Sequence, residues 1–518
     1  MKVEQIKQVI IVGGGTAGWL TANHLAKTLN CTNPLSVQIT LIESKNIPTI
    51  GVGEGTVPVM CQTLAHFGIS ETDFIRQCDA TFKHSIKFID WLDNPTDNKK
   101  ENYFHHLFNY PNIEELDLTP YWLLNKNNTS YANSVSTQGY MCDQGLGPKN
   151  MTHREFEGMA SYAYHLDAAK FSALLTDNAV NKLGVKHILT DVLDATLNVA
   201  GDIESLQTKC AGTVSGDIFI DCTGFAAKLL GDKLKVPFID QSHILFADTA
   251  LAIQVPYQNP DAPINPYTNA TAKEAGWIWD IGLSSRRGIG HVYSSNHTSD
   301  DQAEQTLRDY IGPQADDLTA RKIAMQVGYR KTPWKNNCIA IGLSQGFVEP
   351  LEATGLLVFD ITARMLAQNF PATRKAIPAI SERFNDNITG LWQKVIDFIK
   401  LHYCISRRDD SQFWLDNRAS SSISDSLQSN LALWRDTVPN KYNFTSALEG
   451  FNLENYLYVL YGMEFPTNLQ PIATRFEAHQ QAAFTMEQIA QAANYCQQQL
   501  IPHRELIEKI KRYGLTKI

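Results

Sequence analysis

The sequence predicts an α/β fold: a Rossmann-type nucleotide-binding core, a further β-sheet layer and a mainly helical C-terminal region. Two observations predict it. A glycine-rich turn joins a short apolar strand to a helix near the N-terminus, and apolar residues follow a helical period after about residue 376. We expect residues 1–378 to form the core, assembled from separated segments, and residues 379–518 to form the helical region.

The chain is expected to open with a strand, a glycine turn, a helix and a second strand. Residues 8–12 are a short apolar run typical of a buried strand, and they lead directly into the glycines. Residues 17–29 place their apolar side chains on one helical face, and residues 37–42 alternate apolar and polar positions before Glu43. This order is the beginning of a nucleotide-binding βαβ unit.

Later segments supply further elements. Residues 215–222 and 338–342 are predicted to be buried strands. Polar stretches at 258–276 and 419–429 are predicted to be a surface loop and an exposed connection. The longest C-terminal helices are expected at residues 380–402 and 486–513.

Three glycines of the turn fit the dinucleotide-binding pattern G-x-G-x-x-G. The pattern needs a tight turn, a close approach of the backbone to a pyrophosphate and close packing of the helix on the strand. Free N–H groups at the start of the helix also favour an anion. The pyrophosphate contacts are therefore expected at Gly13, Gly15, Thr16, Ala17 and Gly18. Glu43 is placed to accept hydrogen bonds from ribose hydroxyls.

FAD and NAD are both bound by this glycine pattern, and two other predicted strand ends distinguish between them. One strand leads into Thr223 and Gly224, and the other ends at Gly342. Three glycine-bearing strand ends, far apart in the sequence, suit an extended dinucleotide such as FAD. The sequence has no second G-x-G-x-x-G that would mark a separate NADPH-binding domain.

Composition excludes several classes of protein. The chain has 518 residues with 54 acidic and 45 basic side chains, a net charge of −9 and no basic block, which argues against a nucleic-acid partner. No apolar stretch approaches the roughly 20 residues that cross a bilayer, and the N-terminal apolar run is too short for a signal peptide. The nine cysteines show no C-x-x-C pair or zinc spacing, so we expect a cytoplasmic protein without a metal site.

Four blocks of the sequence resemble the flavin-dependent halogenases of the tryptophan halogenase family, and the resemblance covers most of the chain. The blocks are residues 13–19 (GGGTAGW), 51–58 (GVGEGTVP) running on to 80–83 (ATFK), 277–281 (WIWDI) and 347–355 (FVEPLEATG). The resemblance implies an FAD-dependent monooxygenase-like core, a sheet that forms the substrate layer and C-terminal helices that complete the substrate pocket. It also implies flavin contacts at Gly53, Leu343, Gly355 and Leu356.

The resemblance implies a reaction as well. FADH2 from a separate reductase, oxygen and chloride or bromide would produce hypohalous acid, which travels through the protein to a lysine. There it would halogenate an electron-rich aromatic substrate, similar to indole or tryptophan. Two rival functions are an FAD-dependent aromatic monooxygenase and a flavin-binding protein without turnover. Dimers are common among such enzymes, so a homodimer is possible.

Lys83 and Glu352 match the two catalytic residues of the family. Periodicity alone would favour a solvated lysine at position 83. Its ammonium could hydrogen-bond the oxidant, or its neutral amine could form a haloamine, and the sequence leaves both open. A carboxylate nearby can stabilise a cationic ring and help to remove its proton. Spacing alone would allow Glu349 this role; the resemblance favours Glu352, although Ala353 replaces a serine that is frequent in the family.

A helical pattern follows this block, and Thr354 is the predicted N-cap. The free N–H groups would suit the negative edge of the reduced flavin and a halide. We therefore expect halide contacts at Thr354 and Gly355. The alternative is a helix cap without a ligand.

Trp277, Trp279 and Ile281 resemble the family signature W-x-W-x-I-P, which walls off the flavin from organic substrates; we call these three residues the tryptophan barrier. From alternation alone, the two tryptophans would simply share one face of a strand. Gly282 replaces the proline of the signature, and its wider conformational freedom predicts a looser barrier.

The substrate pocket is less well marked. His106 fits an H-x-F pattern of the aromatic pocket, with His105 as the competing register; adjacent histidines in a strand point to opposite faces, which argues against a metal site. The segment 402–414 also resembles the family without an assigned role. The residues Glu454, Tyr456, Tyr458 and Tyr461 do not align with the family's amino-acid clamp. Free tryptophan, a bare indole, a phenol and a larger aromatic all remain open as substrates.

Overall fold

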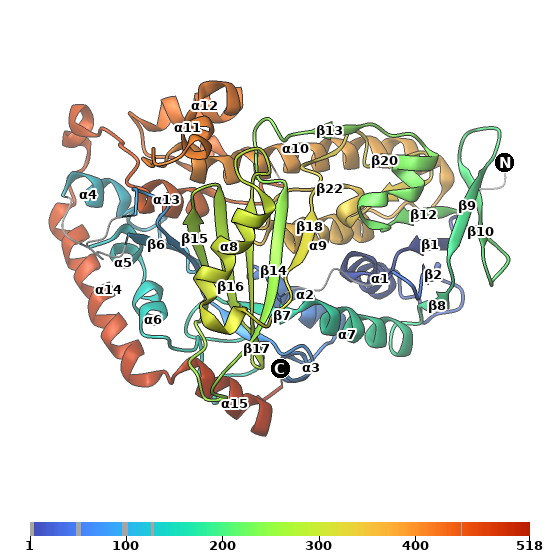
Figure 1. Cartoon of the computed structure of the whole chain (residues 1–518), viewed down its shortest axis with the longest axis horizontal. Coiled ribbons are helices and arrows are strands. Elements are labelled where there is room, and N and C mark those ends of the chain that lie inside the picture. Colours follow the sequence, from blue (N-terminus) through green and yellow to red (C-terminus); the bar gives the residue numbers. More distant parts are fainter. Residues whose placement is uncertain (1–4, 48–52, 96–101, 126–128, 447, 518) are drawn as a thin grey trace.

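The structure is a computed structural model, and it describes residues 5–47, 53–95, 102–125, 129–446 and 448–517. Figure 1 shows a nucleotide-binding region at one end, a large sheet in the middle and C-terminal helices that cover the top and the opposite end. Among the described residues, no helix is long and apolar enough to cross a membrane.

The first sheet carries the glycine turns. Its six strands lie in the order β20-β21-β12-β1-β2-β8. Their bounds are β1 Gln8–Val12, β2 Gln38–Glu43, β8 Lys186–Leu189, β12 Ile218–Asp221, β20 Trp334–Lys335 and β21 Cys338–Ala340. β1 pairs in parallel with β2 and with β12, and β12 pairs in parallel with β21. Strands from distant parts of the chain thus lie side by side, which confirms the predicted α/β core.

Helices cover this sheet. α1 (Thr16–Thr28) follows the glycine turn and packs against α7 (Ala168–Asn181) and α9 (Thr354–Gln368). The buried face of α1 includes Trp19, Leu20 and Leu25, all at most 1% exposed. Burying a large apolar side chain contributes roughly 1.5–3 kcal/mol, so this packing holds the turn against the sheet.

The second sheet has seven strands in the order β18-β14-β17-β16-β15-β5-β6. Their bounds are β5 Ser85–Ile89, β6 Tyr103–Leu107, β14 Thr249–Pro256, β15 Tyr267–Lys273, β16 Gly276–Gly282, β17 Arg286–Tyr293 and β18 Arg321–Ala324. The amphipathic helix α8 (Asp300–Ile311) covers one face, where Leu307 and Ile311 pack with Ile278 and Ile289. The opposite face carries the tryptophan barrier.

Smaller elements connect the two sheets. A three-stranded sheet joins β3 (Gly53–Gly55), β7 (Ala163–Asp167) and β4 (Thr81–Lys83). Two further small sheets consist of β9 Val192–Leu197, β10 Ile203–Thr208 and β11 Thr213–Ser215, and of β13 Phe238–Asp240, β19 Gly328–Arg330 and β22 Gly346–Phe347. The short helices are α2 Val59–Phe67, α3 Glu71–Gln77, α4 Thr119–Leu124, α5 Tyr131–Val135 and α6 Gln138–Asp143.

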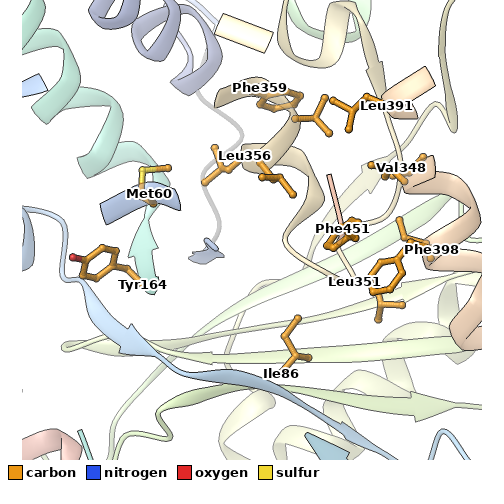
Figure 2. Close-up of a cluster of buried hydrophobic side chains, with 14 of the residues drawn as sticks. Met60, Ile86, Tyr164, Val348, Leu351, Leu356, Phe359, Leu391, Phe398 and Phe451 are labelled. Atoms are coloured by element: carbon orange, nitrogen blue, oxygen red, sulfur yellow. The ribbon is translucent and has the colours of Figure 1, made fainter. Parts of the chain in front are cut away.

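The C-terminal region is helical. Its helices are α10 Ile377–Cys404, α11 Gln412–Arg418, α12 Asp425–Trp434, α13 Leu453–Gly462, α14 His479–Gln499 and α15 His503–Tyr513. In Figure 1, α10 crosses the top of the molecule and α14 runs down the left side. Figure 2 shows how this region joins the core: Ile86 of β5, Leu356 of α9 and Phe398 of α10 belong to one buried cluster.

Three predictions of local structure were wrong. Residues 486–513 form two helices, because Pro502 cannot continue the hydrogen-bond ladder of α14. The predicted loop at 258–276 contains the strand β15, whose small residues pair with β16 and β5. The predicted connection at 419–429 contains the first turn of α12, because Ser424 Oγ accepts a hydrogen bond from the Leu427 amide and caps it.

Candidate active site

The glycine turn has the shape that a dinucleotide phosphate requires. A Cβ atom on Gly13, whose φ is +114°, would lie 2.1 Å from the Cys222 carbonyl oxygen, and one on Gly18 would lie 1.9 Å from the Gly13 carbonyl oxygen. Gly15 differs, because a Cβ there would meet no atom within 4 Å. Gly13 and Gly18 therefore allow the tight turn and the helix packing, whereas Gly15 faces open space at the start of α1.

Neighbouring strand ends complete this cradle. Gly15 is the N-cap of α1, and no described side chain caps the free N–H groups that follow, beginning at Thr16 and Ala17. Gly342, after β21, approaches so closely that a Cβ would lie 2.6 Å from Cβ of Ala17. Gly224, after β12, has φ +68° and open space around it. The donor groups and the room around them fit an extended dinucleotide such as FAD.

Glu43 lies at the end of β2, beside the turn. A Cβ on Gly14 would lie 1.6 Å from its Oε2, so the carboxylate is packed against the turn. Its Oε1 accepts a hydrogen bond from His187 Nε2 at 2.7 Å, a partner that the sequence did not predict. Burial raises the pKa of Glu43, and His187 opposes that shift.

Lys83 ends β4 and is 1% exposed, so the solvated lysine that periodicity favours is wrong. Its Nζ donates to the Thr56 carbonyl oxygen at 3.2 Å and lies 5.3 Å from the centre of the Phe108 ring. Burial lowers the pKa of Lys83 to about 8, although the charge of Glu352 raises it. Lys83 thus remains an ionisable amine near neutral pH, inside the protein.

Glu352 is also 1% exposed. Its Oε1 accepts hydrogen bonds from His106 Nδ1 and from His402 Nε2, each at 2.8 Å. Burial alone would raise the pKa of Glu352, but the two histidines hold it at about 2. Because its charge acts on Lys83, the fold brings the two predicted catalytic residues into one electrostatic environment.

The two histidines of β6 face opposite sides, as the alternation predicts. His106 contacts Glu352 through Nδ1, and its Nε2 lies 3.0 Å from Asn455 Oδ1 on α13. His105 contacts Ser85 and Asp143 on the other face. Of the two histidines, only His106 directs its side chain to Glu352.

Glu349 has different partners. Its Oε2 accepts hydrogen bonds from Trp277 Nε1 and from the Tyr403 hydroxyl, each at 2.6 Å. Burial raises the pKa of Glu349 to about 7, although these two donors and the charge of Lys400 lower it. Glu349 is therefore bound to the tryptophan barrier, and Glu352 is the glutamate whose charge acts on Lys83.

The tryptophan barrier lies on one face of β16. The rings of Trp277 and Trp279 are 6.4 Å apart between centroids, at an angle of 61°. Ile281 follows on the same face, next to Gly53: a Cβ on Gly53 would lie 3.7 Å from Ile281 Cγ2. Gly282 ends the strand, and a Cβ there would lie 2.8 Å from Ile264 Cγ2. Close approach of Ile264, rather than a left-handed backbone, is what favours glycine at this position.

The start of α9 differs from the prediction in one detail. Ala353, not Thr354, is the N-cap, and it has a left-handed φ of +57°. Thr354 is the first helical residue, and its hydroxyl donates to the Glu349 carbonyl oxygen at 3.1 Å. No described side chain caps this end, so the N–H groups around Gly355 and Leu356 stay available to an anion. Leu343 is half-buried in the turn after β21.

Comparisons with known proteins agree with this arrangement. A family model described as tryptophan halogenase matches residues 8–478. The chain belongs to the tryptophan halogenase family. Tryptophan 6-halogenase SttH from Streptomyces toxytricini is 35% identical over 484 residues, which are 89% of this chain and 90% of that protein.

Solved structures of relatives superpose over the whole of this halogenase. A tryptophan halogenase from Shewanella frigidimarina is 45% identical, with a TM-score of 0.95 and 99% of each chain covered. Xcc4156, a flavin-dependent halogenase from Xanthomonas campestris, is 31% identical with a TM-score of 0.87, again with 99% of each chain covered. The predicted fold, the enzyme class and the dependence on flavin, oxygen and halide are thereby confirmed.

Several residues around this halogenase site were not predicted from the sequence. His402 and Thr56 lie in segments that resemble the family but had no predicted role, and neither His187 nor Asn455 was predicted. Their partners lie far away in the chain: His402 and Glu352 are 50 residues apart, and His106 and Asn455 are 349 apart. No local pattern marks such contacts, because they form only when the helices pack on the sheet.

Proposed function

We propose that this enzyme halogenates an electron-rich aromatic substrate of the indole class, with Lys83 and Glu352 at the chemical step. The observation that carries the proposal is the burial of an amine and a carboxylate, each 1% exposed, in one electrostatic environment. Burying two ionisable groups costs stability unless each is compensated. Such a cost is typical of a site retained for chemistry.

Reduced FAD, when bound, supplies hypohalous acid from oxygen and chloride or bromide. The turn residues Gly13, Gly15, Thr16, Ala17 and Gly18 would hold its pyrophosphate, and Glu43 its ribose. Gly53, Leu343, Gly355 and Leu356 would contact the flavin end, and the free N–H groups at Thr354 and Gly355 would bind the halide. The tryptophan barrier would keep organic substrates away from the flavin.

Lys83 would hold the oxidant as an ammonium. With a pKa of about 8, ammonium outnumbers amine by about ten to one at pH 7. One of its three N–H groups donates to Thr56, which leaves two for the oxygen of hypohalous acid. The halogen atom then points away from Lys83, toward the ring that attacks it.

Glu352 would take the proton from the ring. Its Oε1 is held by two histidines, and we find no hydrogen bond to Oε2 among the described residues. When the ring attacks, a carbon–halogen bond forms and the oxygen–halogen bond breaks. Lys83 protonates the departing hydroxide to water, and Oε2 accepts the proton from the halogenated carbon. Return of one proton from Glu352 to Lys83 closes the cycle.

The C-terminal helices would complete the substrate pocket, and the division at residue 378 is part of the proposal. It is supported by Asn455 of α13 against His106, and by His402 of α10 against Glu352. Tryptophan halogenation by the named relatives supports an indole substrate. A separate flavin reductase, a homodimer and a cytoplasmic location belong to the same proposal.

A panel assay tests this function. The enzyme receives a flavin reductase, FAD, NADH, oxygen and chloride or bromide, with tryptophan, other indoles and phenols as substrates. Mass spectrometry should show the isotope pattern of chlorine or bromine in the product, and the K83A variant should lose it. Hydroxylated products would instead identify a monooxygenase, and consumption of FADH2 without any product would indicate a flavin-binding protein.

A further inference from the structure

His402 has an arrangement of partners that determines its protonation. The side chain lies near the end of α10 and is fully buried. Its Nδ1 is 2.9 Å from the Phe398 carbonyl oxygen, and its Nε2 is 2.8 Å from Glu352 Oε1. Both ring nitrogens are therefore at hydrogen-bond distance from an oxygen.

Neither of these oxygens brings a proton of its own. A backbone carbonyl can only accept, and an ionised carboxylate can only accept. A neutral imidazole has one N–H, so it would leave a nitrogen lone pair facing an oxygen lone pair at less than 3 Å. Either His402 carries two protons or Glu352 carries one.

His106, the other partner of Glu352, does not impose this choice. Its second nitrogen faces the side-chain amide of Asn455 at 3.0 Å. That amide can present either its oxygen or its NH2 group to the ring, so a neutral His106 satisfies both contacts. The Phe398 carbonyl belongs to the backbone of α10 and cannot turn over in this way.

The carboxylate partner of His402 favours the cation. Three aromatic rings pack around it: Phe88 at 4.9 Å, Phe398 at 5.2 Å and Trp91 at 6.2 Å between centroids. The charged and titratable groups at the pair are His106 from β6 and Lys83 from β4, which both act on Glu352. The contact with the Glu352 carboxylate at 2.8 Å is what stabilises the cation among these rings.

We propose that His402 is a positioning residue, kept as an imidazolium: its Nδ1–H donates to the Phe398 carbonyl and its Nε2–H donates to Glu352, which holds that carboxylate ionised with Oε1 fixed and Oε2 free. The inference rests on the proposed function in one respect only, that Oε2 faces a substrate. The charge of His402 can be measured without substrate or flavin, so the inference about His402 and the proposed function can fail independently.

The first experiment reads the protonation of the ring directly. The enzyme is labelled with ¹⁵N-histidine, and the His402 signals are assigned by their absence in H402N. At pH 7 we expect both ring nitrogens to be protonated. One unprotonated nitrogen at pH 7 would overturn the proposal, whether or not halogenation is observed.

The second experiment uses the pH profile of kcat/KM. H402N keeps one N–H donor for Glu352 but carries no charge, so Glu352 should hold its proton more tightly. We expect the acid limb to move up by at least about one pH unit, which is tenfold in proton affinity. H291N, in another buried histidine that donates to a backbone carbonyl, should leave the limb in place. An unchanged acid limb in H402N would contradict the proposed charge; H402Q provides a second variant if H402N does not fold.

Discussion

Trp277 donates its indole N–H to Glu349 at 2.6 Å, and the same carboxylate oxygen accepts the hydroxyl of Tyr403. The tryptophan barrier on β16 is thereby tied to α10 through one buried carboxylate. His402, the residue before Tyr403, holds Glu352. Two consecutive residues of α10 thus fix both glutamates of the loop before α9, one for the barrier and one for the chemical step.

Removing the Glu349 carboxylate should destabilise the protein. In E349A two buried donors, on Trp277 and Tyr403, lose their acceptor, and each such loss costs about 1–3 kcal/mol. We expect the free energy of unfolding to fall by about 2–5 kcal/mol in chemical denaturation. E349Q keeps an oxygen that can accept from the same donors, so it should lose less. Equal stability of E349A and the wild type would show that the two hydrogen bonds contribute nothing.

Glu349 should also make stability depend on pH. Its pKa is about 7 in the folded protein, against about 4.3 in an unfolded chain. Between these values the folded state binds more protons, so stability falls as pH rises, by about 1.4 kcal/mol per unit for full occupancy. E349Q lacks this group. The difference in unfolding free energy between wild type and E349Q should therefore decrease by about 3 kcal/mol from pH 4 to pH 7.5. A constant difference would mean that Glu349 is ionised throughout.

Much of the fold could be predicted because its signals are local. The glycine turn, the apolar run before it and the helical periods depend on residues within about twenty positions of one another, and β1, α1, β2 and α10 formed where they were expected. The sequence did not predict β15 because Thr268 to Ala272 are small or polar residues without a strand pattern, and only pairing with β16 and β5 makes them a strand. The break at Pro502 was missed because the apolar period continues across it.

The site could be predicted only in part. Lys83 and Glu352 were marked by resemblance, whereas periodicity alone would have left Lys83 on the surface. The assignment of Glu349 to Trp277, and of His402 to Glu352, depends on where α10 lies over the sheet. Contacts between side chains that lie dozens of positions apart in the sequence follow from packing rather than from any sequence pattern.

Gly282 should not tolerate a side chain. In G282A the new Cβ would lie 2.8 Å from Ile264 Cγ2 and 3.1 Å from the Tyr257 hydroxyl. Ile264 is 2% exposed and cannot move into solvent, so we expect a loss of about 1–3 kcal/mol, measured by thermal unfolding. The double variant G282A/I264A is the control, because removing Ile264 opens the space. It should lose less than the sum of the two single variants; strict additivity would show that the contact does not limit this position.

Gly18 and Gly15 of the turn should respond differently to substitution by alanine. G18A places a Cβ 1.9 Å from the Gly13 carbonyl oxygen, so the turn cannot form unchanged and the protein should lose stability. G15A has open space, so its melting temperature without cofactor should match that of the wild type. Its methyl group would nevertheless occupy the space where a pyrophosphate approaches the backbone. We expect FAD binding by G15A, followed by calorimetry, to be at least tenfold weaker; unchanged affinity would place the pyrophosphate elsewhere.

The buried charge of Lys83 should lower the stability of the folded protein. Its pKa is about 8 in the folded state and about 10.4 in an unfolded chain, so at neutral pH the folded protein bears the cost of a buried charge. K83M removes that charge, and we expect it to be more stable than the wild type by about 2–3 kcal/mol at pH 7, with halogenation abolished.

Between pH 8 and pH 10.4 the unfolded wild type binds more protons than the folded one. Wild-type stability should therefore rise relative to K83M across this window, until the advantage of K83M disappears. K186M, in an exposed lysine of β8, should show neither effect. A K83M variant that is less stable at pH 7, or whose advantage does not change with pH, would mean that the ammonium of Lys83 is fully compensated by Glu352 and by its bond to Thr56.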